Sequence, residues 1–280
     1  MKPDLTEEKK KKEIREFIEK ELCEDEEPLF YAVSGSHLYG FPSEKGGDID
    51  IRGFHAVDSD EHLKLDSPRE QLEVEKNWDS SFEQEKMDLV SYELKKFGYL
   101  VFKTNFNVLE WIFGENIVWN RREEELEELR DIIRSHLPAD VPYHYRGMAK
   151  QNYGKFLDPE SGSYNPTAKK HLYVLRGLLG AKYIQEKREL EPEITEMAKE
   201  LLEEEEKKIV QDLIAGKRGN ETEKASEELI KRADQLINRL FSEIEVESDK
   251  KDEKLTEEID EWMLKTKKKK KKPVTKSGYK

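Results

Sequence analysis

Three early stretches of the chain have strand-like patterns of hydrophobic and polar positions. A short apolar run covers residues 31–33, an alternating segment covers residues 48–57, and another covers residues 85–90. Such patterns predict β-strands, because successive side chains of a strand point to opposite faces. Residues 58–82 are polar and contain an Asp-Ser-Pro turn signal, so we expect an irregular, mobile loop between the second and third strands.

Helical spacing governs most of the remaining sequence. Residues 6–22 carry Ile14, Phe17 and Ile18 on one stripe and predict a helix, and an amphipathic helix directly follows the third strand. Further predicted helices cover residues 121–136, 145–157 and 167–186, and later apolar stripes begin at Ile194, Leu229 and Leu255, with a break at residues 216–220. These later stripes are too short for a long coiled coil and indicate a helical bundle or a dimer surface.

The overall charge restricts the classes of partner. The 280 residues carry a formal net charge of -13, and 40% of them are charged, with a mean hydropathy of -0.94. This composition excludes a membrane-spanning segment, and the Lys/Glu-rich N-terminus is unlike a signal peptide, so we expect a cytoplasmic protein. The negative charge also argues against nonspecific coating of nucleic acid, which needs clustered Lys and Arg.

Two local features stand apart from this acidic background. Six consecutive lysines at residues 267–272 predict a disordered, solvated tail, with contact to RNA or phosphate as the alternative. The single cysteine, Cys23, can form no internal disulfide, and we interpret it as a helix residue rather than a nucleophile.

The strand at residues 48–57 carries the first candidate chemistry. Asp48 and Asp50 share one face of this strand, while Ile49 and Ile51 can be buried on the other. Two carboxylates that close repel each other unless a cation lies between them, and Mg²⁺ prefers such oxygen ligands. Arg52 projects from the same face, where it can pair with these acids or contact phosphate oxygens. The residues leave both interpretations of Arg52 open.

A glycine-serine pair follows the first predicted strand. Pro42 halts any helix that begins near residue 35, so Gly35 and Ser36 are expected at the start of a single helical turn. Unpaired backbone N–H groups at such a start bind anions, and glycine lets a phosphate approach the backbone. Residues 46–47, both glycine, predict a tight turn into the strand of Asp48.

The order of these elements resembles a known signature. An apolar strand, Gly35-Ser36, eleven residues and then Asp48-x-Asp50 are similar to the DNA polymerase beta nucleotidyltransferase superfamily. The extension through Arg52-Gly53 resembles one branch, the RNA-repair-associated polymerase beta family related to the bacterial YcgL proteins. Residues 105–110 continue the resemblance, but Phe106 stands where relatives tend to have proline, which leaves Asn105 as a helix cap.

The resemblance implies a catalytic centre. It calls for a third carboxylate from a neighbouring strand, and Asp88 is the well-placed acid in residues 85–90. In the mechanism it implies, Asp48 and Asp50 hold two Mg²⁺ ions about 3.5–4 Å apart, and Asp88 completes one ion and receives the acceptor's proton. It also implies that Gly35 and Ser36 contact the nucleotide triphosphate, with Ser36 supplying its hydroxyl.

A helix in the second half supplies further nucleotide-binding candidates. Lys169, Tyr173 and Arg176 lie at positions i, i+4 and i+7 of the helix predicted for residues 167–186, and hence on one face. Lys and Arg on one face suit a polyphosphate, and the resembling branch has such a pair at this separation. The alternative is an ordinary solvated face.

We therefore expect an α/β (α+β) protein: a nucleotidyltransferase domain at residues 1–120 with a small mixed sheet, a mostly α-helical domain at residues 121–264, and a basic tail at residues 265–280. The expected activity is Mg²⁺-dependent transfer of a nucleoside monophosphate from an NTP to an acceptor hydroxyl, with RNA as the first candidate acceptor. A protein or small-molecule acceptor, or noncatalytic nucleotide binding, is the alternative. The acceptor, the preferred NTP and the oligomeric state are not specified by the residues.

Overall fold

The computed structural model describes residues 8–43, 48–77, 86–138, 140–219, 226–244 and 253–268. Within these ranges the strands form a five-stranded sheet in the order β3-β4-β2-β1-β5. The bounds are Glu27–Val33 for β1, Asp48–Ala56 for β2, Gln71–Asn77 for β3, Lys86–Glu93 for β4 and Ile117–Asn120 for β5. The β2 and β4 strands pair in parallel and the other pairs are antiparallel, so the sheet is mixed, as predicted.

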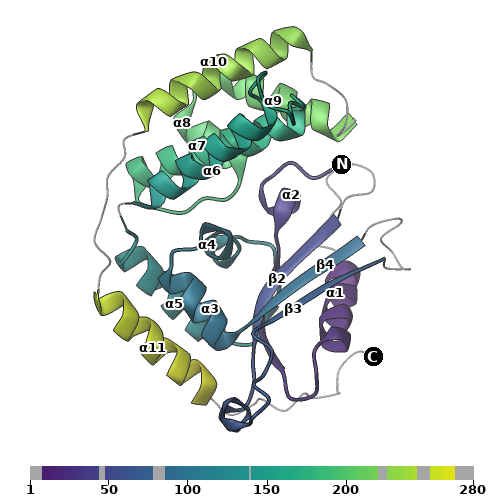
Figure 1. Cartoon of the computed structure of the whole chain (residues 1–280), viewed down its shortest axis with the longest axis vertical. Coiled ribbons are helices and arrows are strands. Elements are labelled where there is room, and N and C mark those ends of the chain that lie inside the picture. Colours follow the sequence, from purple (N-terminus) through teal and green to yellow (C-terminus); the bar gives the residue numbers. More distant parts are fainter. Residues whose placement is uncertain are drawn as a thin grey trace.

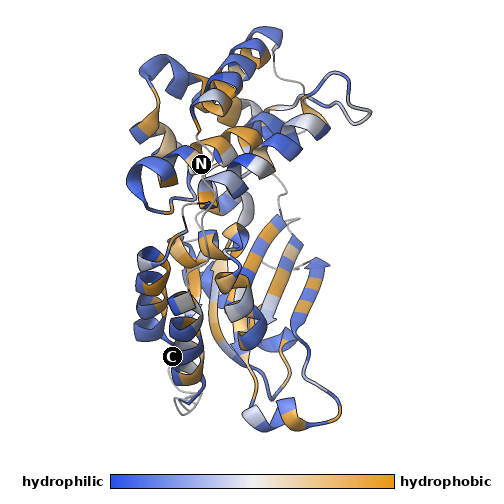
Figure 2. Cartoon of the chain, turned by 60° about the vertical axis from the view of Figure 1, so that its left-hand side comes forward, coloured by the Kyte–Doolittle hydropathy of each residue, from blue (hydrophilic) through white to orange (hydrophobic). Residues whose placement is uncertain are grey.

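Alternation along the strands gives the sheet two different faces (Figure 2). On one face Ile49 and Ile51 of β2 and Met87 and Leu89 of β4 are fully buried, and they pack with the apolar stripe of helix α1 (Glu8–Glu21). The stripe of α1 is the one predicted for residues 6–22, of which residues 6 and 7 lie outside the described residues. Asp48, Asp50 and Asp88 are thereby turned to the opposite face.

Helices cover one end of that opposite face (Figure 1). They are α3 (Leu94–Phe102), α4 (Phe106–Phe113), α5 (Glu123–Ser135) and α11 (Glu253–Lys268). The Phe54 ring, near the end of β2, stacks on Phe97 of α3 with the ring centroids 4.0 Å apart, and Trp262 of α11 packs edge-on against it. The beginning of β2, where Asp48 is exposed, extends beyond these helices. Asn105 caps α4, as expected.

The remaining helices form a bundle above α2 (Gly35–Leu38) in Figure 1. They are α6 (Val141–Phe156), α7 (Ala168–Lys187), α8 (Ile194–Leu201), α9 (Glu204–Gly219) and α10 (Glu227–Glu243). The α7 helix is at the centre, because it packs against each of the other four. Its leucines at positions 172, 175 and 179 are fully buried. No helix in the described ranges is long and apolar enough to cross a membrane.

Several local expectations were wrong. The predicted loop at residues 58–82 contains the 3-10 helix η1 (Ser59–Leu63) and the edge strand β3, whose burial alternates weakly because most of its residues are charged or polar. We expected a helix break beginning at residue 216, but α9 continues to Gly219. Cys23 is exposed and follows α1 rather than lying within it.

The C-terminal part also differs from the predicted domain order. The α11 helix packs against α3 and α5, beside the sheet rather than on the helical bundle. Residues 265–268, which we assigned to the basic tail, belong to this helix, and Thr266 is buried. The rest of that tail, residues 269–280, lies outside the described residues, as do the predicted glycine turn at residues 46–47 and residues 78–85.

Candidate active site

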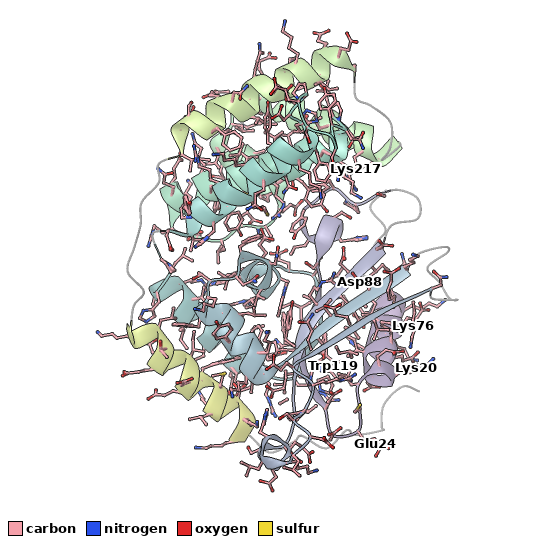
Figure 3. All side chains as sticks on the ribbon, in the orientation of Figure 1. Lys20, Glu24, Lys76, Asp88, Trp119 and Lys217 are labelled. Carbon is pink, nitrogen blue, oxygen red and sulfur yellow. The ribbon has the colours of Figure 1, made fainter. Side chains whose placement is uncertain are left out.

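Two of the three predicted carboxylates lie side by side on neighbouring strands. The parallel register of β2 and β4 pairs Asp50 with Asp88, and it pairs Asp48 with Lys86. The side chains of Asp50 and Asp88 retain 26% and 33% of their exposure, so both reach solvent. Figure 3 shows Asp88 at the end of the sheet that faces α2. The structure therefore brings Asp50 and Asp88 together, with Asp48 at the exposed start of β2.

Arg52 bridges these two acids. Its Nη2 donates to Asp50 Oδ1 at 2.9 Å and to Asp88 Oδ2 at 2.8 Å. Its Nη1 donates to the backbone carbonyls of Asp88, at 2.7 Å, and of Ile51, at 3.0 Å. Of the two interpretations that the sequence left open, the ion pair is the one present in this structure.

The electrostatic environment of Asp50 is unfavourable to its charge. Burial raises the pKa of the Asp50 carboxyl most; the Arg52 guanidinium lowers this pKa in part, and the negative charges of Asp88 and Asp48 raise it again. The net direction is upward. A partly buried carboxylate beside two others is stabilised by a further cation, so this environment suits a bound divalent metal.

The Gly35-Ser36 pair lies directly beside Asp50. The Ser34 amide, at the end of β1, donates to the Asp50 carbonyl at 2.7 Å, and α2 begins at the next residue. Gly35 has a φ of +61°, and a β-carbon added there would overlap Oδ2 of Asp50. This close approach requires glycine, since any side chain would displace the carboxylate. Ser36 is half-buried in the single turn of α2, as the sequence predicts.

The three aspartates are suitable magnesium ligands by chemistry, although the Arg52 guanidinium lies between Asp50 and Asp88. Asp48, Asp50 and Asp88 offer the carboxylate oxygens that Mg²⁺ prefers, on one face of two adjacent strands. Within the described residues, however, no three acidic, histidine or cysteine side chains are gathered closely enough to hold a metal ion. The guanidinium of Arg52 occupies the position between Asp50 and Asp88 that a cation would share.

Comparison with known proteins identifies the family of this chain. The model of the RNA repair pathway DNA polymerase beta family matches residues 6–265. The chain belongs to this family. Family membership indicates a polymerase beta-like nucleotidyltransferase related to RNA repair.

Two relatives agree with this assignment. The uncharacterized protein YcgL of Bacillus subtilis is 27% identical over 246 residues, which cover 85% of this chain and 89% of YcgL. The uncharacterized protein MJ0002 of Methanocaldococcus jannaschii is 32% identical over 153 residues, which cover 54% of this chain and 57% of that relative. The branch of the polymerase beta superfamily that the extension through Arg52-Gly53 resembles is therefore confirmed.

The candidates on α7 differ in how far neighbouring side chains enclose them. Arg176 is 2% exposed and forms an ion pair with Glu110 of α4, and its guanidinium lies 3.8 Å from the centroid of the Tyr39 ring. Tyr173 packs edge-on against the rings of Tyr39 and Phe41. Lys169 is half-buried in the first turn of α7. Arg176 and Tyr173 thus support the segment that follows the Gly35-Ser36 turn, and their contact with a triphosphate stays a prediction.

Sequence reasoning missed Lys217 of α9. This lysine is 1% exposed, and its Nζ donates to the Phe41 carbonyl at 2.6 Å and to Ser43 Oγ at 3.1 Å. Burial lowers the pKa of His37, which follows Ser36, to about 4, with the charges of Lys217 and Lys10 as further causes. Figure 3 shows Lys217 on the side of the bundle that faces α2. Lys217 lies in an amphipathic helix among many lysines, so the sequence carries no signal that singles it out.

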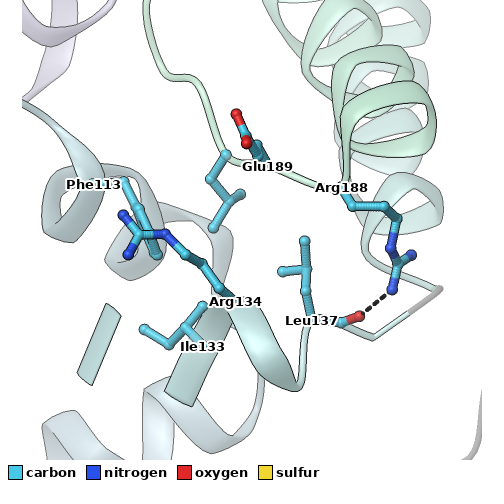
Figure 4. Close-up of a pocket in the computed structure, with 7 residues that line it drawn as sticks. Phe113, Ile133, Arg134, Leu137, Arg188 and Glu189 are labelled. Carbon is cyan, nitrogen blue, oxygen red and sulfur yellow. Dashed lines mark hydrogen bonds between the residues drawn. The ribbon is translucent and has the colours of Figure 1, made fainter. Parts of the chain in front are cut away.

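Two further pockets lie away from the carboxylates. One, of about 310 Å³, lies between the ends of α4, α5 and α7, where the Arg188 Nη2 donates to the Leu137 carbonyl at 2.7 Å (Figure 4). The other, of about 350 Å³, lies between η1, the start of α3 and α11. Neither is lined by the three acids or by the Gly-Ser turn, so neither belongs to the candidate active site.

Proposed function

We propose that this protein is a Mg²⁺-dependent nucleotidyltransferase that transfers a nucleoside monophosphate from an NTP to a hydroxyl group of RNA. The observation that carries the proposal is the in-register pairing of Asp50 and Asp88 beside the Gly35-Ser36 turn. Two acids from neighbouring strands thus lie next to a glycine turn whose backbone a phosphate can approach. Phosphoryl transfer depends on such positioning of charged groups around the phosphate.

The proposed roles follow from these positions. Asp48, Asp50 and Asp88 would hold Mg²⁺, which supplies charge stabilisation for the transferring phosphoryl group. Asp88 accepts the proton of the acceptor hydroxyl, whose oxygen forms a bond to the α-phosphorus. The bond from that phosphorus to the bridging oxygen breaks, and pyrophosphate leaves. The Ser36 hydroxyl donates a hydrogen bond to the triphosphate, with Gly35 allowing the approach, and Lys169 contributes positive charge from α7.

The choice of RNA as the acceptor rests on the family. The family is named for an RNA repair pathway, and the lysine-rich end of α11 adds local positive charge to an acidic chain. An enzyme that consumes NTPs and RNA is expected in the cytoplasm, as the sequence predicts. Transfer to a protein or a small molecule would use the same acids, so the acceptor has to be established by experiment.

The test is an incubation of the full chain with each α-labelled NTP, Mg²⁺ and a set of acceptors. We expect label on tRNA or another short RNA, and its loss by at least about 100-fold in Asp50→Asn, because removing one group that stabilises the transition state has effects of this size. Asp131→Asn on α5, an exposed aspartate 75% accessible at its side chain, is the matched control and should retain full activity. Label on protein would redirect the proposal to a protein acceptor.

Tight Mg²⁺-dependent NTP binding without transfer to any acceptor would instead indicate a noncatalytic nucleotide-binding protein. The Arg52 bridge between the acids is the observation that favours this second candidate, because a cation supplied by the chain now takes the position between two of the carboxylates. Equal activity of Asp50→Asn and the unchanged protein on a verified acceptor would overturn the proposed site.

A further inference from the structure

We propose that Arg52 is a resident counter-cation, which holds Asp50 and Asp88 together in the metal-free protein and has to be displaced before a metal ion can bind between them. Arg52 would then weaken binding of free Mg²⁺ and couple metal binding to nucleotide binding. The inference rests on the proposed function, because it assumes that Asp50 and Asp88 are metal ligands.

The contacts of Arg52 are specific to this position. One guanidinium nitrogen, Nη2, donates to both carboxylates, and the other, Nη1, donates to the carbonyls of Asp88 and Ile51. The side chain is 21% exposed, and its two acidic partners are fixed by the register of β2 and β4. Four directed bonds in a partly buried place bind this arginine more firmly than an exposed ion pair, which is worth little.

The same contacts compete with a divalent ion. Nη2 uses one oxygen of each carboxylate and stands between the two strands, where a cation shared by Asp50 and Asp88 would lie. Two positive charges held that close would repel each other, so metal binding and the Arg52 bridge exclude one another. Displacing the guanidinium breaks two charge-assisted hydrogen bonds, and free Mg²⁺ therefore binds more weakly than it would to the three carboxylates alone.

A triphosphate offers the displaced guanidinium a new partner. Phosphate oxygens match the planar fork of arginine, and Gly35 brings the Asp50 carboxylate next to the turn where the phosphates are proposed to lie. Binding of a nucleotide therefore offsets the free energy that is lost when the hydrogen bonds of Arg52 to Asp50 and Asp88 break. Metal and nucleotide should bind cooperatively through Arg52, and removing this side chain should weaken the coupling.

The experiment measures Mg²⁺ binding to the full chain by titration calorimetry, with and without a nonhydrolysable NTP analogue. We expect Arg52→Gln to bind Mg²⁺ in the absence of nucleotide at least about tenfold more tightly than the unchanged protein, the equivalent of about one good ion pair. The analogue should tighten Mg²⁺ binding markedly in the unchanged protein and much less in Arg52→Gln.

Lys86→Gln is the matched control, because it removes one positive charge from the same face. Lys86 is opposite Asp48 in the register, but it is half exposed and pairs with Glu75 rather than bridging two acids. Its Mg²⁺ affinity should stay within about twofold of the unchanged protein, as for an exposed charge. Melting temperatures in EDTA provide a readout independent of titration: Arg52→Gln should melt lower than the unchanged protein and regain most of the difference with Mg²⁺.

Should Arg52→Gln fail to fold, Arg52→Lys keeps the charge without the fork that holds both carboxylates, and it should bind Mg²⁺ more tightly than the unchanged protein. Equal or weaker Mg²⁺ binding by these variants, with clear binding by the unchanged protein, would overturn the role of Arg52 and leave the proposed function intact. Absence of Mg²⁺ binding by the unchanged protein, even with the nucleotide analogue, would overturn both.

Discussion

Gly35 and Asp50 approach each other so closely that a β-carbon at position 35 would overlap a carboxylate oxygen of Asp50. Two elements that are separated in the sequence meet at this contact: the turn that follows β1 and the acidic beginning of β2. The amide of Ser34 and the carbonyl of Asp50 fix the backbones with a hydrogen bond of 2.7 Å. The proposed phosphate-binding turn is therefore in direct contact with one of the proposed metal ligands.

Gly35→Ala tests this contact. The new methyl group meets Asp50 Oδ2, and the φ of +61° is strained for alanine, so we expect a loss of stability of about 1–3 kcal/mol and a larger loss of transfer activity. Chemical denaturation and initial rates measure the two effects. Gly154→Ala is the control: Gly154 lies in α6 with open space where its β-carbon would be, and alanine should stabilise this helix by about 0.5–1 kcal/mol. Similar effects of both substitutions would contradict the role of Gly35.

The environment of Asp50 predicts a pH dependence in the metal-free protein. The pKa of Asp50 is raised in the folded state, chiefly by burial, so folding favours the protonated carboxyl. This contribution is fully present below the pKa of the unfolded chain, near pH 4, and is lost as the pH rises through the higher pKa of the folded protein. Asp50→Asn removes this term. In EDTA, the unfolding free energy of Asp50→Asn minus that of the unchanged protein should therefore increase from pH 4 to pH 7. A difference that stays constant over this pH range would contradict the raised pKa of Asp50.

The sequence predicted much of the site, because strand parity alone places Asp48, Asp50 and Arg52 on one face. The neighbouring position of Asp88 came from the family resemblance, and the β2–β4 register agrees with it. The partners of Arg52 were left open, since its distance from two acids on different strands depends on tertiary pairing. The edge strand β3 was missed, because residues 71–77 alternate weakly and carry many charges. The return of α11 to the sheet could not be read from an amphipathic stripe, which shows that a face is buried but does not name its partner.

Lys217 is expected to attach the helical bundle to the segment that leads into β2. Lys217→Met keeps most of the buried stem but removes the donor to the Phe41 carbonyl, which should cost about 1–3 kcal/mol of stability. The charge of Lys217 also lowers the pKa of His37, so this pKa should rise above about 4 in the variant, as followed by NMR.

Lys208→Met is the control for that experiment, because Lys208 is exposed on the same α9 helix. This variant should change the unfolding free energy by less than about 0.5 kcal/mol and should leave the pKa of His37 unchanged. An unchanged His37 pKa in Lys217→Met would show that the two side chains do not interact as the structure indicates.

The buried pair of Glu110 and Arg176 distinguishes a supporting role for Arg176 from direct nucleotide binding. Each side chain is 2% exposed, so removing one partner leaves a buried charge without its counter-ion. We expect Arg176→Met and Glu110→Gln each to lower the unfolding free energy by about 3–5 kcal/mol. The double variant should lose much less than the sum of the two, because no buried charge remains uncompensated.

Kinetics then separate the two roles of Arg176. A supporting arginine predicts that Glu110→Gln and Arg176→Met change the KM for the NTP in the same direction and to a similar extent, because both disturb the packing of Tyr39 after the Gly35-Ser36 turn. An arginine that binds the triphosphate predicts a much higher KM in Arg176→Met alone, since Glu110→Gln leaves the guanidinium available for phosphate. The ratio of the two KM values at a temperature where both variants are folded therefore decides whether Arg176 positions the turn or contacts the substrate.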